Sequence, residues 1–387
     1  MVCGSSRQII FLFVRERRNC TVEWLIILVV VLAALALGLC YLVSCVGRFG
    51  LVRKLSRGRN WTRRLISLAI LAVIFVLLAL WLSPVNAVVA FLHGVLFFLL
   101  FGLAARLLRR VTGREARIYW QGWLALGVTV MWLGAGYLLC SHVWQTDYSL
   151  GTDKKLGTLK IALIADSHLG TTFDGEGFAE HLRVIGEQEP DLLVIAGDFV
   201  DDSSKREDLD RACRALGELE LPYGVWFVYG NHDAGYYNSR DFSAADLEDT
   251  LQRNGVHVLR DTAELVDDRF YLVGREDRSR AGRKTMAELL EGLDRDKYLI
   301  VLDHQPNDYA AEASAGADLV LSGHSHGGQL IPITYVGEWF GMLDRTYGWE
   351  RREGTDFIVT SGISCWEILF KTGTRSEYVL ITVEGNP

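Results

Sequence analysis

Apolar residues divide the chain near residue 145 into two parts with different patterns. Before that point, four long apolar runs at 22–46, 65–82, 87–105 and 118–144 contain one charged residue between them, and none shows the polar stripe of a surface helix. A bilayer core about 30 Å thick requires about 20 apolar residues in a helix, so each run is long enough or nearly so. A cleaved signal peptide fits poorly, because the first run is too long and three more follow.

The first part is therefore predicted to be an all-α, four-span transmembrane region at residues 22–144. Its helices are expected at about 22–46, 65–83, 87–108 and 118–142, after a basic N-terminal tail at 1–21.

After residue 145 the pattern changes to short β-rich runs separated by polar, helix-compatible stretches. Residues 145–157 are expected to be a linker and 158–387 a folded domain. Continuous apolar runs of strand length alternate with helical segments, which is typical of an α/β domain whose sheet is parallel or mixed and covered on both faces. Strands are expected at 159–166, 191–198, 223–231, 297–304 and 317–324, within 256–277, and near the end at 356–362 and 377–385.

Charge follows the same division. Residues 1–144 carry 16 Lys and Arg against 3 Asp and Glu, and the remainder carries 24 against 44. Basic residues gather at 48–64 and 106–117, so the positive-inside rule places both segments in the cytoplasm and the C-terminal part outside the cell membrane. Four arginines in the N-terminal tail oppose this orientation, which nevertheless remains the favoured one. The acidic balance of the second part argues against a nucleic-acid partner.

Five predicted strands end in residues that commonly bind metals. The segments read "IADSH", "AGDFV", "YGNHD", "LDHQP" and "SGHSH", and they contain Asp166, His168, Asp198, Asn231, His232, Asp233, His304, His324 and His326. Sites in open α/β sheets form outside the carboxyl ends of strands, so these segments are expected to converge on one place. Residues two apart in an extended segment point the same way, and glycines before Asp198, Asn231 and His324 would permit tight turns.

The ligand types and their number predict two divalent metal ions. Mixed imidazole and carboxylate ligands suit Mn, Fe or Zn better than Ca or Mg. Two aspartates, one asparagine and four histidines exceed what one ion normally draws from a protein. With a bridging carboxylate, two ions about 3.5–4 Å apart could clamp the attacking and leaving oxygens of an in-line displacement.

The ordered set "DSH…GD…GNHD…H…GHSH" resembles the calcineurin-like metallophosphoesterase superfamily, and the "GHSHGGQ" ending is most similar to its bacterial membrane-associated phosphohydrolases. The resemblance covers about residues 158–385 and implies a sandwich of mixed β-sheets flanked by helices. It also implies that one metal is held by Asp166, His168 and His326, the other by Asn231, His304 and His324, with Asp198 bridging them. His232 would stabilise phosphoryl charge or protonate the leaving oxygen, with Asp233 as its orienting partner, while metal-activated hydroxide attacks phosphorus.

The resulting expectation is a membrane-anchored phosphohydrolase acting on a phosphoester or pyrophosphate bond, with a lipid-linked substrate as one candidate. The alternatives are a tethered phosphodiesterase or phosphatase for soluble substrates, and a non-catalytic membrane receptor or scaffold that retains the fold. Protein partners are not indicated.

Asp201 and Asp202 are interpreted as a solvated loop, and four aromatic residues as packing or as a lipid-facing groove: Trp339, Phe340, Tyr347 and Trp349. Cys213 and Cys365 could pair, but nothing in the sequence requires it.

Overall fold

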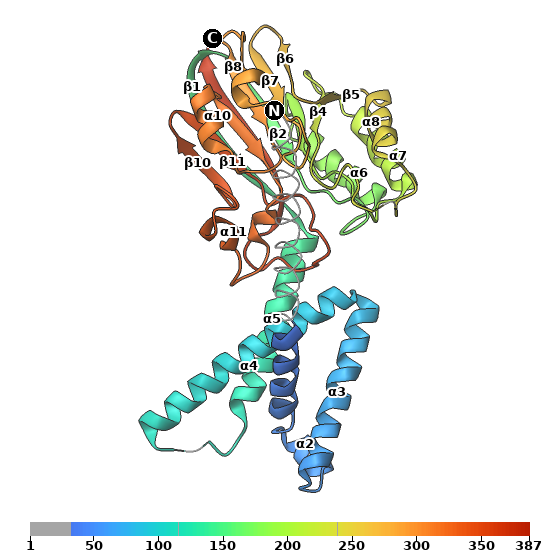
Figure 1. Cartoon of the computed structure of the whole chain (residues 1–387), viewed down its shortest axis with the longest axis vertical. Coiled ribbons are helices and arrows are strands. Elements are labelled where there is room, and N and C mark those ends of the chain that lie inside the picture. The colour runs from blue at the N-terminus through green and yellow to red at the C-terminus, as the bar shows by residue number, and fades with distance from the viewer. Residues whose placement is uncertain (1–31, 115, 238) are drawn as a thin grey trace, which may run out of the picture. The chain divides into compact units, whose positions relative to one another are not determined.

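A computed structural model describes residues 32–114, 116–237 and 239–387 and divides the chain into two units between Trp132 and Leu133 (Figure 1). The expected basic tail at 1–21 and the first ten residues of the first expected span lie outside the described residues.

The N-terminal unit is helical. It contains an apolar helix at Leu32–Val46, α2 (Gly50–Leu55), α3 (Asn60–Trp81), α4 (Pro84–Thr112) and the first half of α5 (Trp120–Ser141). The sequence sets the ends of α4: the Ser83 hydroxyl accepts from the Asn86 amide, Pro84 occupies the first turn, and Gly113 ends the helix with a φ of 65°.

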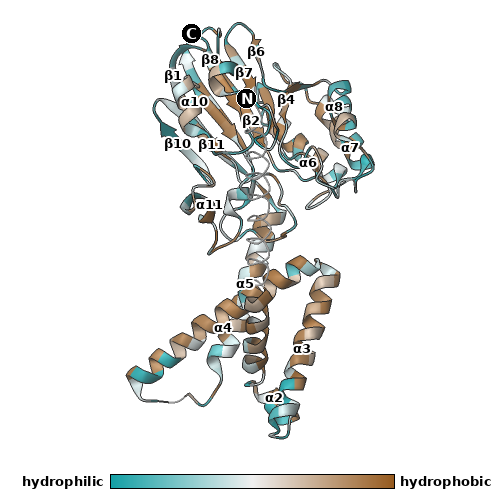
Figure 2. Cartoon of the chain, in the orientation of Figure 1, coloured by the Kyte–Doolittle hydropathy of each residue, from teal (hydrophilic) through white to brown (hydrophobic). Residues whose placement is uncertain are grey.

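Three of the described helices, α3, α4 and α5, are long and apolar enough to cross a membrane. Their residues are predominantly hydrophobic (Figure 2). Large apolar side chains such as Leu77 and Met131 are exposed. Leu32–Val46, within the first expected span, is apolar but shorter than the other three in its described part.

The C-terminal unit contains two six-stranded mixed sheets. The first has the order β1-β12-β2-β3-β4-β5, with bounds β1 (Val143–Lys155), β2 (Thr158–Ile164), β3 (Leu192–Ala196), β4 (Val225–Val228), β5 (Val256–Leu259) and β12 (Ser376–Asn386). The second has the order β10-β11-β9-β8-β7-β6, with bounds β6 (Thr262–Val266), β7 (Phe270–Gly274), β8 (Tyr298–Leu302), β9 (Leu319–Ser322), β10 (Gly348–Arg352) and β11 (Thr355–Val359).

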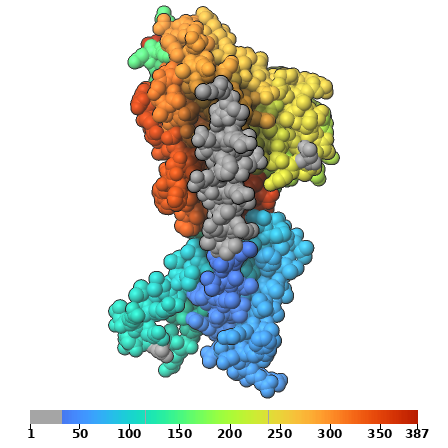
Figure 3. All heavy atoms as spheres, in the orientation of Figure 1, coloured from blue at the N-terminus to red at the C-terminus, as the bar shows by residue number. Residues whose placement is uncertain are grey.

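The two sheets pack face to face around one apolar core and are covered outside by helices. Residues such as Leu163, Val194 and Ile300 fill the layer between the sheets. The outer face of the first sheet is covered by α6 (Gly175–Gly186), α7 (Arg206–Gly217) and α8 (Ala244–Arg253), and that of the second by α9 (Met286–Leu289) and α10 (Tyr309–Ala315). Figure 3 shows these two flanks as the yellow-green and orange surfaces of this unit. The predicted mixed-sheet α/β sandwich with flanking helices is confirmed.

The expectation that residues 145–157 form a linker is wrong. Residues 143–155 form the edge strand β1, which pairs in parallel with β12 from Val143 opposite Ser376 to Gly151 opposite Glu384. Of its side chains only that of Leu150 is buried, so the strand carries no apolar run. Its backbone hydrogen bonds to β12, rather than side-chain burial, hold it in the sheet, which is why hydrophobic periodicity could not reveal it.

Candidate metal centre

The candidate ligands lie at the carboxyl ends of strands from both sheets. Asp166 and His168 follow β2, Asp198 follows β3, and Asn231 follows β4, all in the first sheet. The second sheet supplies His304 after β8 and the pair His324 and His326 after β9. The site is therefore built at one end of the sandwich rather than on a single open sheet.

The first ligand group consists of Asp166, His168 and His326, whose ligand atoms all lie within 4.8 Å of one another. The two imidazoles face each other with 3.3 Å between their Nε2 atoms, and His326 Nε2 lies 3.9 Å from Asp166 Oδ1. All three side chains are buried or nearly so. Nitrogen lone pairs directed at one point require a proton or a cation between them.

The second group consists of Asp198, His304 and His324. His304 Nε2 lies 3.1 Å from Asp198 Oδ2 and 3.3 Å from His324 Nδ1. His304 Nδ1 lies 2.7 Å from the Ala196 carbonyl oxygen, to which its N–H donates, so the Nε2 lone pair is left for a metal. Asp198 Oδ2 is also 3.8 Å from His168 Nε2, so this carboxylate lies between the two groups.

Backbone geometry explains why His324 and His326 belong to different groups. Five candidate ligands have a left-handed φ: 55° at Asp166, 38° at His168, 51° at Asp198, 69° at His324 and 47° at His326. These segments are therefore not extended, and the rule that residues two apart point the same way does not apply. Non-glycine residues in this region are strained, and such strain clusters at functional sites.

The glycines that precede the candidate ligands mainly allow the loops after neighbouring strands to pack closely against one another. A Cβ on Gly230 would lie 2.1 Å from Asp198 Oδ1, and one on Gly323 would lie 2.7 Å from Asp166 Oδ2. Only Gly197 combines such crowding with a positive φ, of 85°. Two of the three glycines are thus required for space and not, as the sequence suggested, for turn conformation.

Burial lowers the pKa of two candidate ligand histidines, His324 and His326, whereas in His168 and His304 the neighbouring carboxylates outweigh burial and raise the pKa. Burial and the neighbouring His304 lower the pKa of His324 to about 4, and burial beside His168 lowers the pKa of His326 well below its usual range. Burial alone would raise the pKa of Asp198, but the charge and hydrogen bond of His304 bring it below its ordinary value. A carboxylate together with imidazoles is the mixed donor set that divalent first-row cations prefer.

Asn231 completes the set of candidate ligands. Its neighbours in the sequence both contact Asp198. Gly230 packs against the Asp198 carboxylate, and the backbone N–H of His232 donates to Asp198 Oδ1 at 2.8 Å. Its Nδ2 donates to the hydroxyl of Tyr236 at 2.9 Å, while its Oδ1 is buried without a hydrogen-bond partner. An orphaned buried oxygen beside two imidazole–carboxylate groups fits a metal ligand, so the residues present fit two divalent cations.

The expected pairing of His232 with Asp233 is wrong in geometry. Both oxygens of the buried Asp233 carboxylate accept backbone N–H bonds, from Asp198 at 2.8 Å, Gly230 at 2.7 Å and Val200 at 3.0 Å. Asp233 therefore ties the loop after β3 to the loop after β4. Its three short backbone partners could not have been predicted from its place beside His232 in the sequence.

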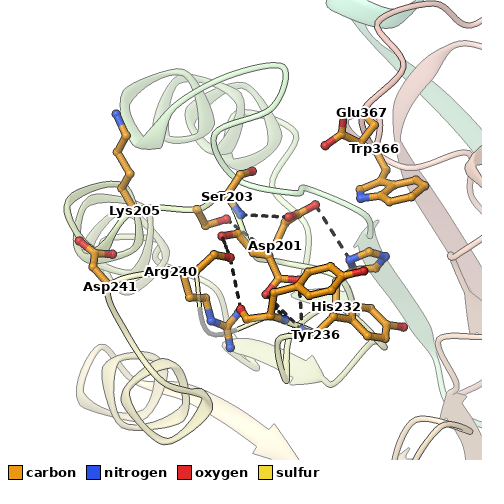
Figure 4. Close-up of a pocket in the computed structure, with 13 residues that line it drawn as sticks. Asp201, Ser203, Lys205, His232, Tyr236, Arg240, Asp241, Trp366 and Glu367 are labelled. Carbon is orange, nitrogen blue, oxygen red and sulfur yellow. Dashed lines mark hydrogen bonds and ion pairs between the residues drawn. The ribbon is translucent and has the colours of Figure 1, made fainter. Parts of the chain in front are cut away.

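Asp201, interpreted from sequence as part of a solvated loop, is the carboxylate that faces the histidines. Its Oδ2 lies 3.4 Å from His168 Nδ1. The same oxygen lies 4.0 Å from His232 Nδ1 (Figure 4). The side chain is largely buried, and its Oδ1 accepts from the Ser203 amide at 3.1 Å. Its distance of three residues from Asp198 is the only sequence signal that could have suggested this position.

A cavity of about 820 Å³ opens beside His232. Its walls come from the loops after β3 and β4 and from the segment at 366–367 (Figure 4). The His232 ring lies between two aromatic side chains, with ring centroids 5.1 Å from Tyr236 and 5.4 Å from Trp366. This volume is typical of small-molecule sites. The sequence did not single out either aromatic residue.

The other singled-out residues lie away from the ligand groups. His257 stacks on Trp226 with ring centroids 4.1 Å apart, as expected of a structural residue. Cys213 is a buried residue of α7, and the sulfur that approaches Cys365, at 2.9 Å, belongs to Cys140. Trp339 and Phe340, for which packing and a lipid-facing groove were both considered, are 71% and 77% exposed, so they do not pack in the core.

Comparison with known proteins points to one family. The profile of the calcineurin-like phosphoesterase family matches residues 159–328. The chain is 32% identical over 248 residues to an uncharacterized metallophosphoesterase of Aquifex aeolicus, covering 62% of this chain and 90% of that protein. It is 28% identical over 335 residues to "Transmembrane protein with metallophosphoesterase domain" of Danio rerio, covering 79% and 74%. An uncharacterized metallophosphoesterase of Bacillus subtilis is 30% identical over 234 residues, covering 58% and 79%.

Proposed function

Because the chain belongs to the calcineurin-like metallophosphoesterase family and is a metal-dependent phosphoesterase, we propose that it is a membrane-anchored dinuclear phosphohydrolase. Its reaction is hydrolysis of a phosphoester or pyrophosphate bond. The observation that carries the proposal is the pair of buried Asp–His–His groups, with Asp198 between them.

The proposed ligand assignment follows the two groups. Asp166, His168 and His326 would hold one cation. His304, His324 and Asn231 would hold the second, and Asp198 would be shared between the two. The donor set suits manganese, iron or zinc. Bound divalent cations would supply Lewis-acid stabilisation of the phosphoryl oxygens and a water of lowered pKa.

His232 is the proposed catalytic residue among the groups that do not bind metal. It borders the cavity, and its ring lies 5.0 Å from that of His168, so it reaches the substrate from beside the ligand groups. In its protonated form it donates to the phosphoryl or leaving-group oxygen. The Asp201 carboxylate, on the Nδ1 side of both rings, orients His168 and His232 and replaces Asp233 in the role expected from sequence.

The N-terminal region is proposed to cross the cell membrane four times and to leave the catalytic unit outside. Three apolar helices, the apolar Leu32–Val46 and relatives named transmembrane proteins support membrane anchoring. The basic residues at 48–64 and 106–117 support the external placement. A phosphoester or pyrophosphate with a lipid portion is the proposed substrate, since four spans exceed what a simple anchor requires.

The experiment is hydrolysis by the purified full chain in detergent. A chromogenic phosphodiester, a phosphomonoester and a lipid pyrophosphate in mixed micelles are offered with manganese, beside His232→Ala and the surface control His257→Ala. Turnover is expected to fall about 10²–10⁴-fold in His232→Ala, which is the usual contribution of a general acid to the rate. Turnover of the control His257→Ala should change little. Hydrolysis that is unchanged in His232→Ala contradicts its role, and a strong preference for soluble esters contradicts the lipid substrate.

A further inference from the structure

The segment from Ile331 to Met342, called here the apolar loop, exposes large apolar side chains. It directly follows the site motif that ends in His326 and contains the short helix α11 (Val336–Trp339). Six large apolar side chains along it are 42–77% exposed, and they are Ile331, Ile333, Tyr335, Trp339, Phe340 and Met342. Contiguous apolar surface of this kind marks an interaction site.

The loop is a formed structure rather than an extended tail. Thr334 is buried, and its hydroxyl donates to the Leu330 carbonyl at 3.1 Å. A Cβ on Gly328 would lie 2.1 Å from the Thr334 carbonyl oxygen, so the loop is packed closely onto the preceding motif. Successive backbone bonds continue through α11, including Trp339 N–H to the Tyr335 carbonyl at 3.0 Å. The exposed side chains are therefore held outward by a satisfied backbone.

The single charge of the loop is turned inward. Glu338 is the only Asp, Glu, Lys or Arg between residues 331 and 342, and its Oε1 accepts from the Thr346 amide at 2.5 Å. The nearby arginines are also engaged within the unit: Arg345 with Glu350, and Arg351 with Asp356. The exposed face of the apolar loop therefore consists of aliphatic, thioether and aromatic side chains.

Two hydrogen bonds connect the start of the loop to the end of α5. Lys371 N–H donates to the Gly136 carbonyl at 2.9 Å, and the next residue, Thr372, accepts from Ile331 N–H through its hydroxyl at 2.9 Å. From Gly136 back to Trp120, α5 continues for about 17 residues, or about 25 Å of helix. That length nearly spans a bilayer core, so Gly136 lies close to its boundary.

We propose that the apolar loop inserts into the interfacial region of the lipid bilayer beside the end of α5. Trp and Tyr side chains favour this region because they combine an apolar ring with a polar group. Insertion places the site next to the lipid surface, and a second cavity of about 460 Å³ lies between the loop and the site, lined by Met342, Leu343 and His324. This inference extends the proposed function by naming the surface from which an amphiphilic phosphoester would enter.

The test is photocrosslinking of the full chain in vesicles of phosphatidylethanolamine and phosphatidylglycerol. A benzophenone amino acid replaces Phe340 in one variant and, as the control, Leu265, which is 45% exposed on β6. Lipid adducts at position 340 and none at position 265 are expected by mass spectrometry. Equal lipid labelling at both positions would overturn the proposal. It would also be overturned if position 340 crosslinks to protein alone, whether to residues 1–31, to a second copy of the chain or to another protein.

A second readout connects the loop to catalysis. Trp339→Ser with Phe340→Ser should lower hydrolysis of a vesicle-embedded phosphoester about tenfold and leave a soluble ester within twofold. Equal loss on both esters would contradict a role in lipid access. The crosslinking result does not depend on turnover, so failure of the loop to contact lipid and failure of the proposed hydrolase are distinguished.

Discussion

At the scale of single residues, Asp201 is the side chain whose role the structure changes most. Its carboxylate lies 3.4 Å from Nδ1 of His168 and 4.0 Å from Nδ1 of His232, within ion-pair distance of both rings. Loss of a carboxylate behind a metal-bound histidine typically costs 10–100-fold in metal affinity or activity. Asp201→Asn is therefore expected to lower manganese affinity or kcat by that factor. The control is Asp249→Asn, whose partner on α8 is an exposed arginine. Metal titration of turnover checks the prediction, and equal behaviour of the two variants would refute it.

The strand-end pattern predicted which polar residues gather, but not which of them contact one another. Asp166, His168, Asp198, His304, His324 and His326 form the two groups because each follows a strand, and strand ends are visible as apolar runs. The partners of Asp233 and Asp201 depend on the left-handed backbone at Asp198 and on the turn at Ser203. Such loop conformations are not encoded in hydrophobic periodicity.

At the scale of secondary-structure elements, α10 is joined to the second sheet by a buried charge cluster. Arg275, after β7, lies 2.8 Å from Asp303, 2.9 Å from Asp308 and 3.4 Å from Glu312, and Arg283 also pairs with Asp303. Two guanidinium groups thus face three carboxyl groups. Burial and the charge of Asp303 raise the pKa of Glu312 well above its usual value.

This cluster predicts a pH-dependent stability. Because the folded-state pKa of Glu312 is raised, the folded chain holds the proton more tightly than the unfolded chain, and stability falls as pH rises from about 4.5 through the folded pKa. Glu312→Gln keeps the shape without a proton to lose, so it should unfold at a higher temperature than the wild type at pH 8, with a smaller difference at pH 5. Thermal unfolding in detergent from pH 5 to 9 checks this, with exposed Glu291→Gln as control. If the unfolding temperature of Glu312→Gln changes with pH in the same way as that of the wild type, Glu312 is ionised in the folded chain.

β1 gives a second prediction at this scale. A fragment that begins at Thr158 lacks the strand and leaves the backbone of β12 unpaired along its edge, whereas one that begins at Val143 retains it. The shorter fragment is expected to unfold at a lower temperature or to aggregate, as unprotected sheet edges do. Thermal unfolding and size-exclusion chromatography of the two fragments make the comparison. Indistinguishable behaviour would mean that β1 contributes no stability.

The main helices and central strands of the C-terminal unit were predictable because their burial produces strong apolar periodicity. The elements that the sequence did not reveal are β1, β10 and α11, which have few buried side chains. They are held by backbone pairing with a neighbouring strand or by packing of their flanking loops. Their existence depends on tertiary partners rather than on local pattern.

At the scale of the whole molecule, the proposed orientation in the membrane rests on the basic segments at 48–64 and 106–117. A reporter enzyme that is active only outside the cytoplasm should be active when fused after Pro387 and inactive when fused after Gly113. A reporter active only in the cytoplasm should show the reverse pattern. Cytoplasmic activity at both positions would contradict the external placement of the catalytic unit.

The measurement that tests the account most directly is the metal content and turnover of the purified full chain. Elemental analysis should find about two divalent cations per chain, and removal with a chelator should abolish phosphoester hydrolysis until manganese, iron or zinc is restored. Asp198→Asn, which weakens the carboxylate between the two groups, should retain at most about one cation and lose turnover. Hydrolysis that survives chelation, or an Asp198→Asn variant with full metal content and full activity, would contradict the dinuclear centre.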